Sequence, residues 1–216
     1  MTDALLKSIG EKFPLEKIDA GDLAVLKASG MRFTVEAYNA AGLGRVSVMR
    51  ASGFLGLMKM DTLIVTPTEL DLPLYSYDRI LAFGKDTLIV EVYDTLLGED
   101  HDTSGMMAAK DRYLSLPDRD PGTHWYDGIK MQTSISKKGG KAHSSGLSSL
   151  AAEHFAAYFE TPAEPISPSE REAKLTRSAV YVNGLLEQGG PSTDVFKKSL
   201  GREKTERLFK SLLFGI

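Results

Sequence analysis

One acidic residue stands inside a stretch that otherwise reads as a buried strand. In LPLYSYDRILAF, residues 72–83, Asp78 is flanked by leucine, isoleucine and aromatic residues. Alternation along a strand puts Asp78 on the same face as Ser76 and Ile80, away from the neighbouring tyrosines. Burying a charged, unpaired carboxylate is unfavourable. We therefore expect Asp78 to find hydrogen-bond partners, open onto a cavity or hold a proton, and the last state suits a general acid.

Familiar catalytic motifs elsewhere in the chain are incomplete. GLGRVS, residues 42–47, lacks the third glycine of a dinucleotide loop and falls between two expected strands, where a hairpin is the better interpretation. GGKAHS, residues 139–144, has Ala142 where a phosphate loop needs a magnesium-binding hydroxyl. SISK, residues 134–137, fits Ser-x-x-Lys but no companion motif follows. These patterns predict neither a nucleotide site nor a serine hydrolase.

The chain also offers little for a metal site. Glu99, Asp100, His101 and Asp102 make an oxygen-rich cluster, but a solvated acidic turn before a helix is the interpretation that we favour. The other histidines lack the spacing of metal ligands, so we expect no metal. With no cysteine, the chain cannot supply a thiol nucleophile or a cysteine-ligated iron–sulfur cluster. Any redox activity must draw its electrons from a partner protein or an organic cofactor.

Three lysines, Lys137, Lys138 and Lys141, fall in a glycine-rich stretch that reads as a loop. They are either ordinary solubilising side chains or a site for the carboxylates of an anionic ligand or an acidic protein. Composition leaves both interpretations open.

The elements that must position Asp78 follow from length and periodicity. A chain of 216 residues with 42% hydrophobic content favours one domain, residues 1–216. A formal net charge of −3 argues against nucleic acid. The sequence has no apolar run long enough to span a membrane, and its amino terminus reads as an amphipathic helix rather than a signal peptide. We therefore expect a soluble, cytoplasmic protein with no membrane partner.

Strands precede helices along the chain. A helix is expected over 2–19, then two strands in 31–51 turning at 42–44, a third in 54–67, and a fourth and fifth in 72–83 and 87–96. Short links between the strands indicate an antiparallel meander. A sixth strand over 131–136 and helices over 103–116, 145–159, 169–188 and around Val195 and Leu208 complete the pattern. This order predicts an α+β domain with helices packed on the sheet.

Two stretches in this order resemble one known family. LPLYSYDRILAFGKDTLIVEVYDTLLG resembles the central strand pair of the ferredoxin-dependent bilin reductases, a group related to the red chlorophyll catabolite reductases. YVNGLLEQGGPSTDVFKKSLGREKTERLFKSLLFGI resembles the family's carboxyl end, and LPDRDPGTHWYDGIKMQTSISKK resembles its tryptophan-containing region. Together the matches cover roughly half of the chain, and their collinearity carries the inference.

The resemblance implies a three-layer α/β/α sandwich with a central antiparallel sheet and a pigment pocket beneath the carboxy-terminal helices. It places Asp78 at the family's central proton-transferring aspartate, with Ser76 leaving room for a flat tetrapyrrole. It implies that the chain itself binds no metal or flavin, and that ferredoxin or flavodoxin supplies single electrons. Lys137 aligns near a basic residue that pairs with a propionate. Arg50 and Thr62 fall where some members carry a glutamate and a histidine.

Three hypotheses follow. The first is a ferredoxin-dependent oxidoreductase that reduces a bilin or a related open-chain pigment. Asp78 would relay protons, Lys137 and Arg50 would hold acidic side groups, and Thr62 would line the pocket. The second is a non-catalytic tetrapyrrole carrier of the same fold. The third makes Asp78 a structural residue paired with an arginine, so that only the fold is shared.

Overall fold

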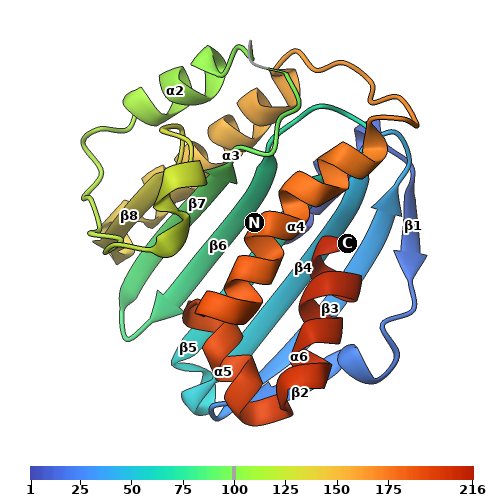
Figure 1. The fold of residues 1–216 in the computed structure, drawn as a ribbon. Helices are drawn as coiled ribbons and strands as arrows, with labels where there is room; N and C mark the ends of the chain where they lie inside the picture. The colour runs from blue at the N-terminus through green and yellow to red at the C-terminus, as the bar shows by residue number, and fades with distance from the viewer. Residues whose placement is uncertain (99–100) are drawn as a thin grey trace.

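The computed structural model describes residues 1–98 and 101–216 and shows one antiparallel sheet of eight strands. Along the sheet the order is β1-β3-β4-β5-β6-β7-β8, with β2 pairing beside β1 on β3 (Figure 1). The strands are β1 (Leu15–Ile18), β2 (Val25–Ala28), β3 (Met31–Ala40), β4 (Gly44–Gly53), β5 (Met58–Pro67), β6 (Leu74–Ala82), β7 (Lys85–Tyr93) and β8 (Ile135–Gly140).

Five consecutive strands, β3 to β7, form the meander that the sequence predicts. Each pairs antiparallel with the next along nearly its whole length. Gly42 and Gly84 adopt positive φ angles of 83° and 76° in two of the turns, a conformation that favours glycine. These strands carry apolar residues on both sides, because helices cover both faces of the sheet.

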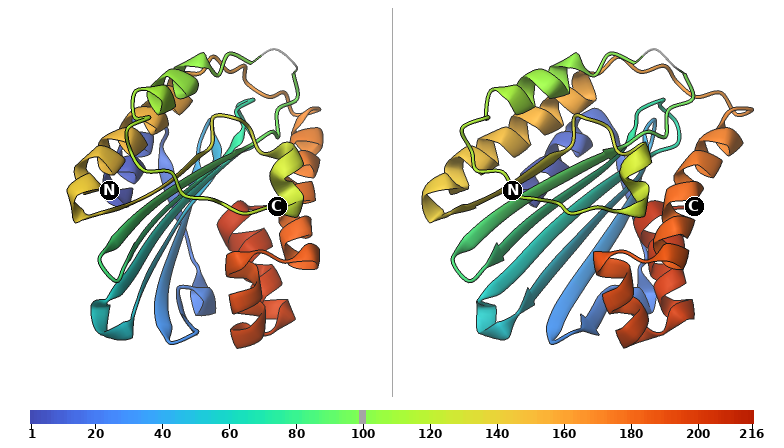
Figure 2. Two further views of the ribbon diagram at one scale, coloured as in Figure 1. Left: turned by 90° about the vertical axis from the view of Figure 1, so that its left-hand side faces the viewer. Right: turned by 60° about the vertical axis from the view of Figure 1, so that its left-hand side comes forward.

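Helices cover both faces of the sheet, as the two views of Figure 2 show. One face carries α1 (Thr2–Lys12), α2 (Ser104–Asp111) and α3 (Ser144–Glu160). The other carries α4 (Arg171–Gln188), α5 (Pro191–Leu200), α6 (Arg202–Arg207) and the π-helical segment η5 (Leu208–Phe214). Short 3-10 helices are η1 (Gly21–Leu23), η2 (Phe54–Gly56), η3 (Trp125–Ile129) and η4 (Lys141–His143). The expected three-layer α/β/α sandwich with an antiparallel sheet is confirmed.

No helix in the described part of the chain has both the length and the apolar character needed to cross a bilayer.

Two expected boundaries were wrong. The first helix ends at Lys12, because Pro14 follows, and residues 15–18 form β1 instead. The last strand is Ile135–Gly140 rather than 131–136, so much of the expected glycine-rich loop belongs to β8. Both segments are extended because they pair with strands that lie far away in sequence, β3 for β1 and β7 for β8.

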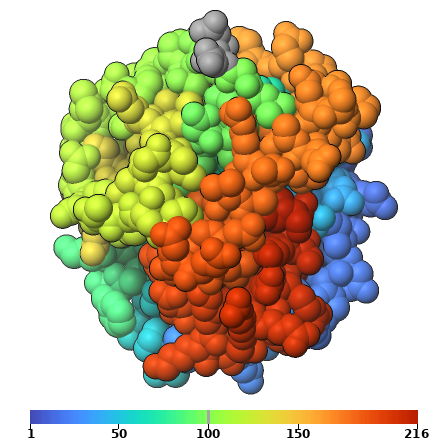
Figure 3. Space-filling view, viewed as in Figure 1, coloured from blue at the N-terminus to red at the C-terminus, as the bar shows by residue number. Residues whose placement is uncertain are grey.

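The carboxy-terminal layer is attached to the sheet by buried polar contacts. Lys174 of α4 is fully buried, and its Nζ donates to Asp71 Oδ1 at 2.8 Å and to the Leu72 carbonyl at 2.7 Å. Ser47 Oγ of β4 donates to the Leu213 carbonyl at 2.9 Å. In the space-filling view this layer covers the sheet face that lies behind it (Figure 3).

Trp125 packs directly against α4, and this contact gives a test of the layer. A methyl group added at Gly184 would lie 2.1 Å from the Trp125 ring, whereas one added at Gly105 of α2 would sit at an ordinary 3.6 Å from Ala157. We expect Gly184→Ala to lower the free energy of unfolding by about 1–3 kcal/mol through overpacking. The control Gly105→Ala should be neutral or raise it by up to about 1 kcal/mol, because alanine favours a helix.

Urea unfolding of both variants measures the difference. Equal stability in the two would contradict the packing of α4 on Trp125.

Candidate functional site

A cavity of about 160 Å³ lies between the sheet and the carboxy-terminal layer. Its floor consists of side chains from β4 to β7, most of them apolar, such as Met60, Ile64, Ile80 and Ile89. Its roof comes from α4, from the start of α5 and from η5, and one side from residues 119–126. Segments that are distant in sequence therefore meet around one partly open, mainly apolar cavity.

Asp78 projects from the centre of the floor. In register it lies opposite Thr62 of β5 and Ile89 of β7, and Thr62 Oγ1 donates a hydrogen bond to Asp78 Oδ1. The residue is half-buried, since it lies deep in the protein but faces the cavity. Burial raises the pKa of Asp78 to about 6; the Thr62 hydrogen bond opposes this shift, and the nearby Glu91 charge adds to it.

Glu91 of β7 supplies a second carboxylate on the same face. It lies opposite Ser76 and lines the cavity with it, diagonally next to Asp78. Tyr181 Oη donates to Tyr93 Oη at 2.8 Å, and Tyr93 Oη donates to Glu91 Oε2 at 2.7 Å. Burial raises the pKa of both tyrosines, so they stay protonated and keep donating. The chain of hydrogen bonds links α4 to the cavity carboxylate.

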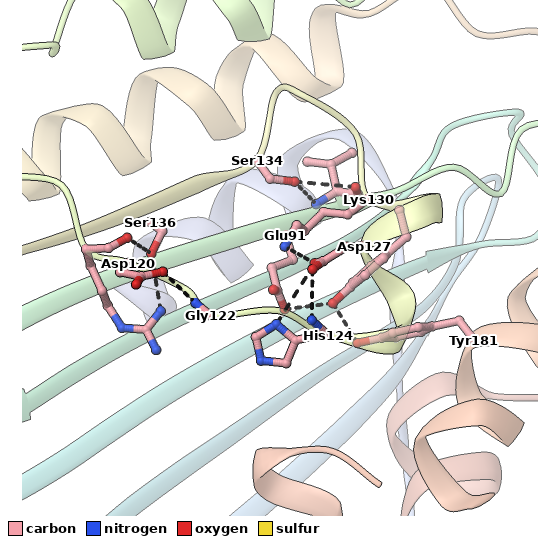
Figure 4. A network of polar contacts seen from close by, with 12 residues as sticks. Glu91, Asp120, Gly122, His124, Asp127, Lys130, Ser134, Ser136 and Tyr181 are labelled. Atoms are coloured by element: carbon pink, nitrogen blue, oxygen red, sulfur yellow. Dashed lines mark hydrogen bonds and ion pairs between the residues drawn. The ribbon is translucent and has the colours of Figure 1, made fainter. Parts of the chain in front are cut away.

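An imidazole faces these groups from the segment before η3. The His124 ring stacks on Tyr126 at 4.8 Å with an interplanar angle of 8°. Among the described residues its buried Nδ1 atom makes no hydrogen bond, and Asp127 Oδ1 lies 3.9 Å from it. In Figure 4, Glu91, His124 and Tyr181 converge from β7, from this segment and from α4.

Arg119 adds a positive charge at one side of the cavity. Its Nη1 donates to Ser136 Oγ at 3.2 Å, and its backbone is held by the same serine of β8. Among the described residues no carboxylate lies within ion-pairing distance of its guanidinium. Arg119 is therefore available to an anionic group in the cavity.

Three of the five predicted site residues come together, and two do not. Asp78, Ser76 and Thr62 share the cavity. Arg50 projects from the opposite face of β4, where its guanidinium pairs with Glu36 at 2.9 Å and with Asp3 of α1. Lys137 also projects from that face; it is 4% exposed and its Nζ bonds to the Leu116 carbonyl at 2.9 Å and Asp118 Oδ1 at 2.7 Å.

The structure therefore does not bring Arg50 or Lys137 to the cavity. The three lysines also do not form one loop. Lys137 and Lys138 alternate between the faces of β8, and only Lys138 and Lys141 are exposed.

The acidic cluster considered as a cation site includes Glu99 and Asp100, which lie outside the described residues. His101 Nε2 lies 3.2 Å from Asp71 Oδ2, and Asp102 Oδ1 accepts the Ser104 N–H at 2.9 Å. Within 1–98 and 101–216 no group of three or more metal-ligating side chains is gathered.

Sequence reasoning missed Glu91, Arg119 and His124. Glu91 alternates with the apolar residues of its strand as Asp78 does, so the same criterion applied to TLIVEVY would have found it. Arg119 and His124 lie in an irregular segment, and no periodicity indicates where such a segment folds.

The fold has a counterpart among solved structures. No family model and no curated protein sequence matches the chain. The crystal structure of phytochromobilin synthase from tomato in complex with biliverdin aligns with 99% of this chain and 81% of that chain, with a TM-score of 0.77 and 13% identity. The fold implied by the sequence resemblance is therefore confirmed by a solved structure.

The raised pKa of Asp78 makes a prediction about stability. In the folded protein this carboxyl stays largely neutral up to about pH 6, whereas in the unfolded chain it ionises near pH 4. The free energy of unfolding therefore falls as pH rises from about 4 to 6, and the loss remains at higher pH. Asp78→Asn should therefore raise the free energy of unfolding at pH 8 by up to about 3 kcal/mol and change it little at pH 4.

Urea unfolding at the two pH values measures this effect. Asp111→Asn, on the exposed side of α2, is the control. An Asp78→Asn effect of the same size at both pH values would contradict a raised pKa.

Proposed function

We propose that this chain reduces a linear tetrapyrrole (a bilin) or a related open-chain pigment, with electrons delivered by a separate ferredoxin or flavodoxin. One observation carries the proposal. Asp78 holds a carboxyl of pKa about 6 at the floor of a mainly apolar cavity, in a fold shared with a protein solved in complex with biliverdin.

Reducing one double bond of such a pigment consumes two electrons and two protons. A carboxyl with a pKa near 6 can both give a proton and regain one near neutral pH. Asp78 is the proposed donor to the pigment, since it faces the cavity centre. Glu91 lines the cavity diagonally next to Asp78, so it is the proposed group that passes a proton back to Asp78.

The electrons must come from outside the chain. Without cysteine it cannot ligate an iron–sulfur cluster through thiolates. A one-electron protein donor is therefore the proposed source, and the chain itself is proposed to bind no cofactor. Proton delivery from Asp78 then stabilises each added electron, since a protonated pigment radical accepts the second electron more readily than an anionic one.

The remaining cavity residues suit a flat, apolar pigment with acidic side groups. Met60, Ile80 and Ile89 offer an apolar floor, and Tyr126 and Tyr181 present aromatic rings. Arg119 takes the role that sequence reasoning gave to Lys137 and Arg50, the binding of a pigment carboxylate.

The cavity is smaller than the roughly 300–1,000 Å³ typical of small-molecule sites. An extended pigment has to displace side chains of the roof, such as Phe209, Leu213 and Phe214 of η5. The carboxy-terminal layer is therefore the part that we expect to move on binding.

A carrier without catalysis is the second candidate. Met49 and Thr62 are the cavity residues of β4 and β5 beside Asp78, and neither is an acid or base near neutral pH. A chain that relies on Asp78 and Glu91 alone could hold a pigment without reducing it. The lack of an acid or base at Met49 and Thr62 is the observation that favours the carrier.

Anaerobic mixing with biliverdin and a reduced ferredoxin system, followed by absorbance, separates the two. Progressive loss of the biliverdin spectrum that needs the donor supports reduction. A static spectral shift that is independent of the donor supports the carrier. The absence of any spectral change would overturn both.

Asp78→Asn tests the proton donor. The amide keeps the shape and still accepts the Thr62 hydrogen bond but has no proton to deliver, so we expect turnover to fall by about 100-fold, with pigment affinity nearly unchanged. Asp61→Asn, on the opposite face of β5, is the matched control and should keep full turnover. Full activity in Asp78→Asn would contradict a catalytic role for this carboxyl.

Arg119→Met tests the carboxylate contact. Methionine keeps much of the apolar stem but removes the charge, so biliverdin should bind about tenfold more weakly. Arg112→Met, on the exposed end of α2, removes a charge away from the cavity and should leave binding unchanged. Titration by absorbance measures both. Equal affinity in the two variants would remove Arg119 from the site.

A further inference from the structure

Two neighbouring turns at one end of the sheet expose large apolar side chains. The turn between β4 and β5 carries Phe54, Leu55 and Leu57, and the turn between β6 and β7 carries Phe83. Leu55 is fully exposed, Phe83 is 69% exposed and Leu57 is 61% exposed. Leu81, at the end of β6, extends this surface. Figure 3 shows the two turns next to each other at the lower left of the molecule.

The two turns form one surface. The Phe54 and Phe83 rings lie 6.3 Å apart, and the Phe83 N–H donates to the Leu57 carbonyl at 3.3 Å. Met58 pairs in register with Ala82 directly behind them. We call the surface made by Phe54, Leu55, Leu57, Leu81 and Phe83 the apolar tip.

Folding does not explain why these residues are apolar. Phe54, Leu55 and Phe83 have φ angles of 52°, 55° and 50°, the left-handed conformation that favours glycine or asparagine. Leu55 is fully exposed, so it contributes no burial in return for this strained backbone. The sequence thus places bulky apolar groups where a turn alone would be more stable with a small or polar residue.

The charge around the apolar tip is positive. Residues 51–60 and 80–85 contain Lys59 and Lys85 and no carboxylate, although the whole chain has a net charge of −3. Arg32 is exposed and lies opposite Ser52, which in turn lies opposite Lys59. Two acids flank these ranges: Asp86 is buried in an ion pair with Arg79, and the partly exposed Asp61 lies opposite Arg50 and Arg79 in the sheet.

We propose that the apolar tip docks this protein on an anionic lipid bilayer. Phe54, Leu55 and Phe83 insert among the acyl chains at the interface, while Arg32, Lys59 and Lys85 contact the lipid phosphates. This peripheral contact needs no spanning helix, but it departs from the expectation, drawn from the sequence, of no membrane partner. It also does not depend on the chemistry of the cavity.

The shape of the surface favours a bilayer over a protein groove. Leu55 is fully exposed in its turn, so its side chain protrudes from the surface, and a fluid bilayer yields to protruding side chains. Aromatic and leucine side chains beside basic residues are the combination that interfacial membrane segments share. Lysine and arginine near an anionic surface add attraction that salt weakens.

Sedimentation with lipid vesicles tests the proposal. We expect the full chain to bind phosphatidylcholine vesicles that contain about 30% phosphatidylglycerol, and to bind pure phosphatidylcholine at least about tenfold more weakly. Binding should weaken in high salt. The double variant Leu55→Asn and Phe83→Asn should reduce binding to the anionic vesicles by about tenfold or more.

The substitutions are chosen so that the double variant still folds. Asparagine accepts the left-handed conformation, so the double variant should melt at the same temperature as the natural chain or higher. Leu114→Asn, an exposed leucine elsewhere on the chain, is the matched control and should bind vesicles normally.

Three results would overturn the proposal. The first is a natural chain that fails to sediment with anionic vesicles, and the second is a double variant that sediments as well as the natural chain. The third is self-association, or binding to an acidic protein, that the double variant loses while neither protein binds vesicles. That result would assign the apolar tip to a protein interface.

Discussion

Alternation along antiparallel strands governs everything that the cavity contains. Each residue of a strand belongs to one face, and its cross-strand partners share that face. Asp78 therefore meets Thr62, while its neighbours Tyr77 and Arg79 point into the opposite layer. A slip of one residue in β6 would bury Asp78 in the apolar core and turn a tyrosine into the cavity. The buried tyrosines of β6 thus hold the register that presents the carboxyl.

The cavity roof depends on contacts that lie outside the cavity. Lys174 is fully buried and ties α4 to Asp71, which also accepts the Leu97 and Gly98 N–H groups. Breaking such a buried pair by removing one partner is costly, about 3–5 kcal/mol. At the other end of α4, Trp125 Nε1 donates to the Gly189 carbonyl at 2.9 Å. The helix is therefore fixed at both ends, which leaves η5 and the start of α5 as the parts of the roof that can yield to a ligand.

The sequence indicated the central meander and the helical layers because their signals are local. Glycine turns such as Gly84 and alternation within each strand are visible in a short window. The edge strands were missed or misplaced because LEKI and ISKKGG are extended only through pairing with β3 and β7. The same limit applied to the site. Asp78 was found because it breaks the pattern of its own strand, whereas the faces of Arg50 and Lys137 depend on a register that the sequence did not specify.

Asp78 and Glu91 show how one face can carry two carboxylates with different properties. Asp78 has one hydroxyl donor and an apolar surround, so burial dominates and raises its pKa. Glu91 accepts a hydrogen bond from Tyr93, which accepts one from Tyr181, so hydrogen bonds connect this carboxylate to α4. The proximity of Glu91 also favours the neutral form of Asp78. Asp78 therefore lowers the stability of the folded protein near neutral pH. It does so at a cavity, where its proton can be transferred to a bound ligand.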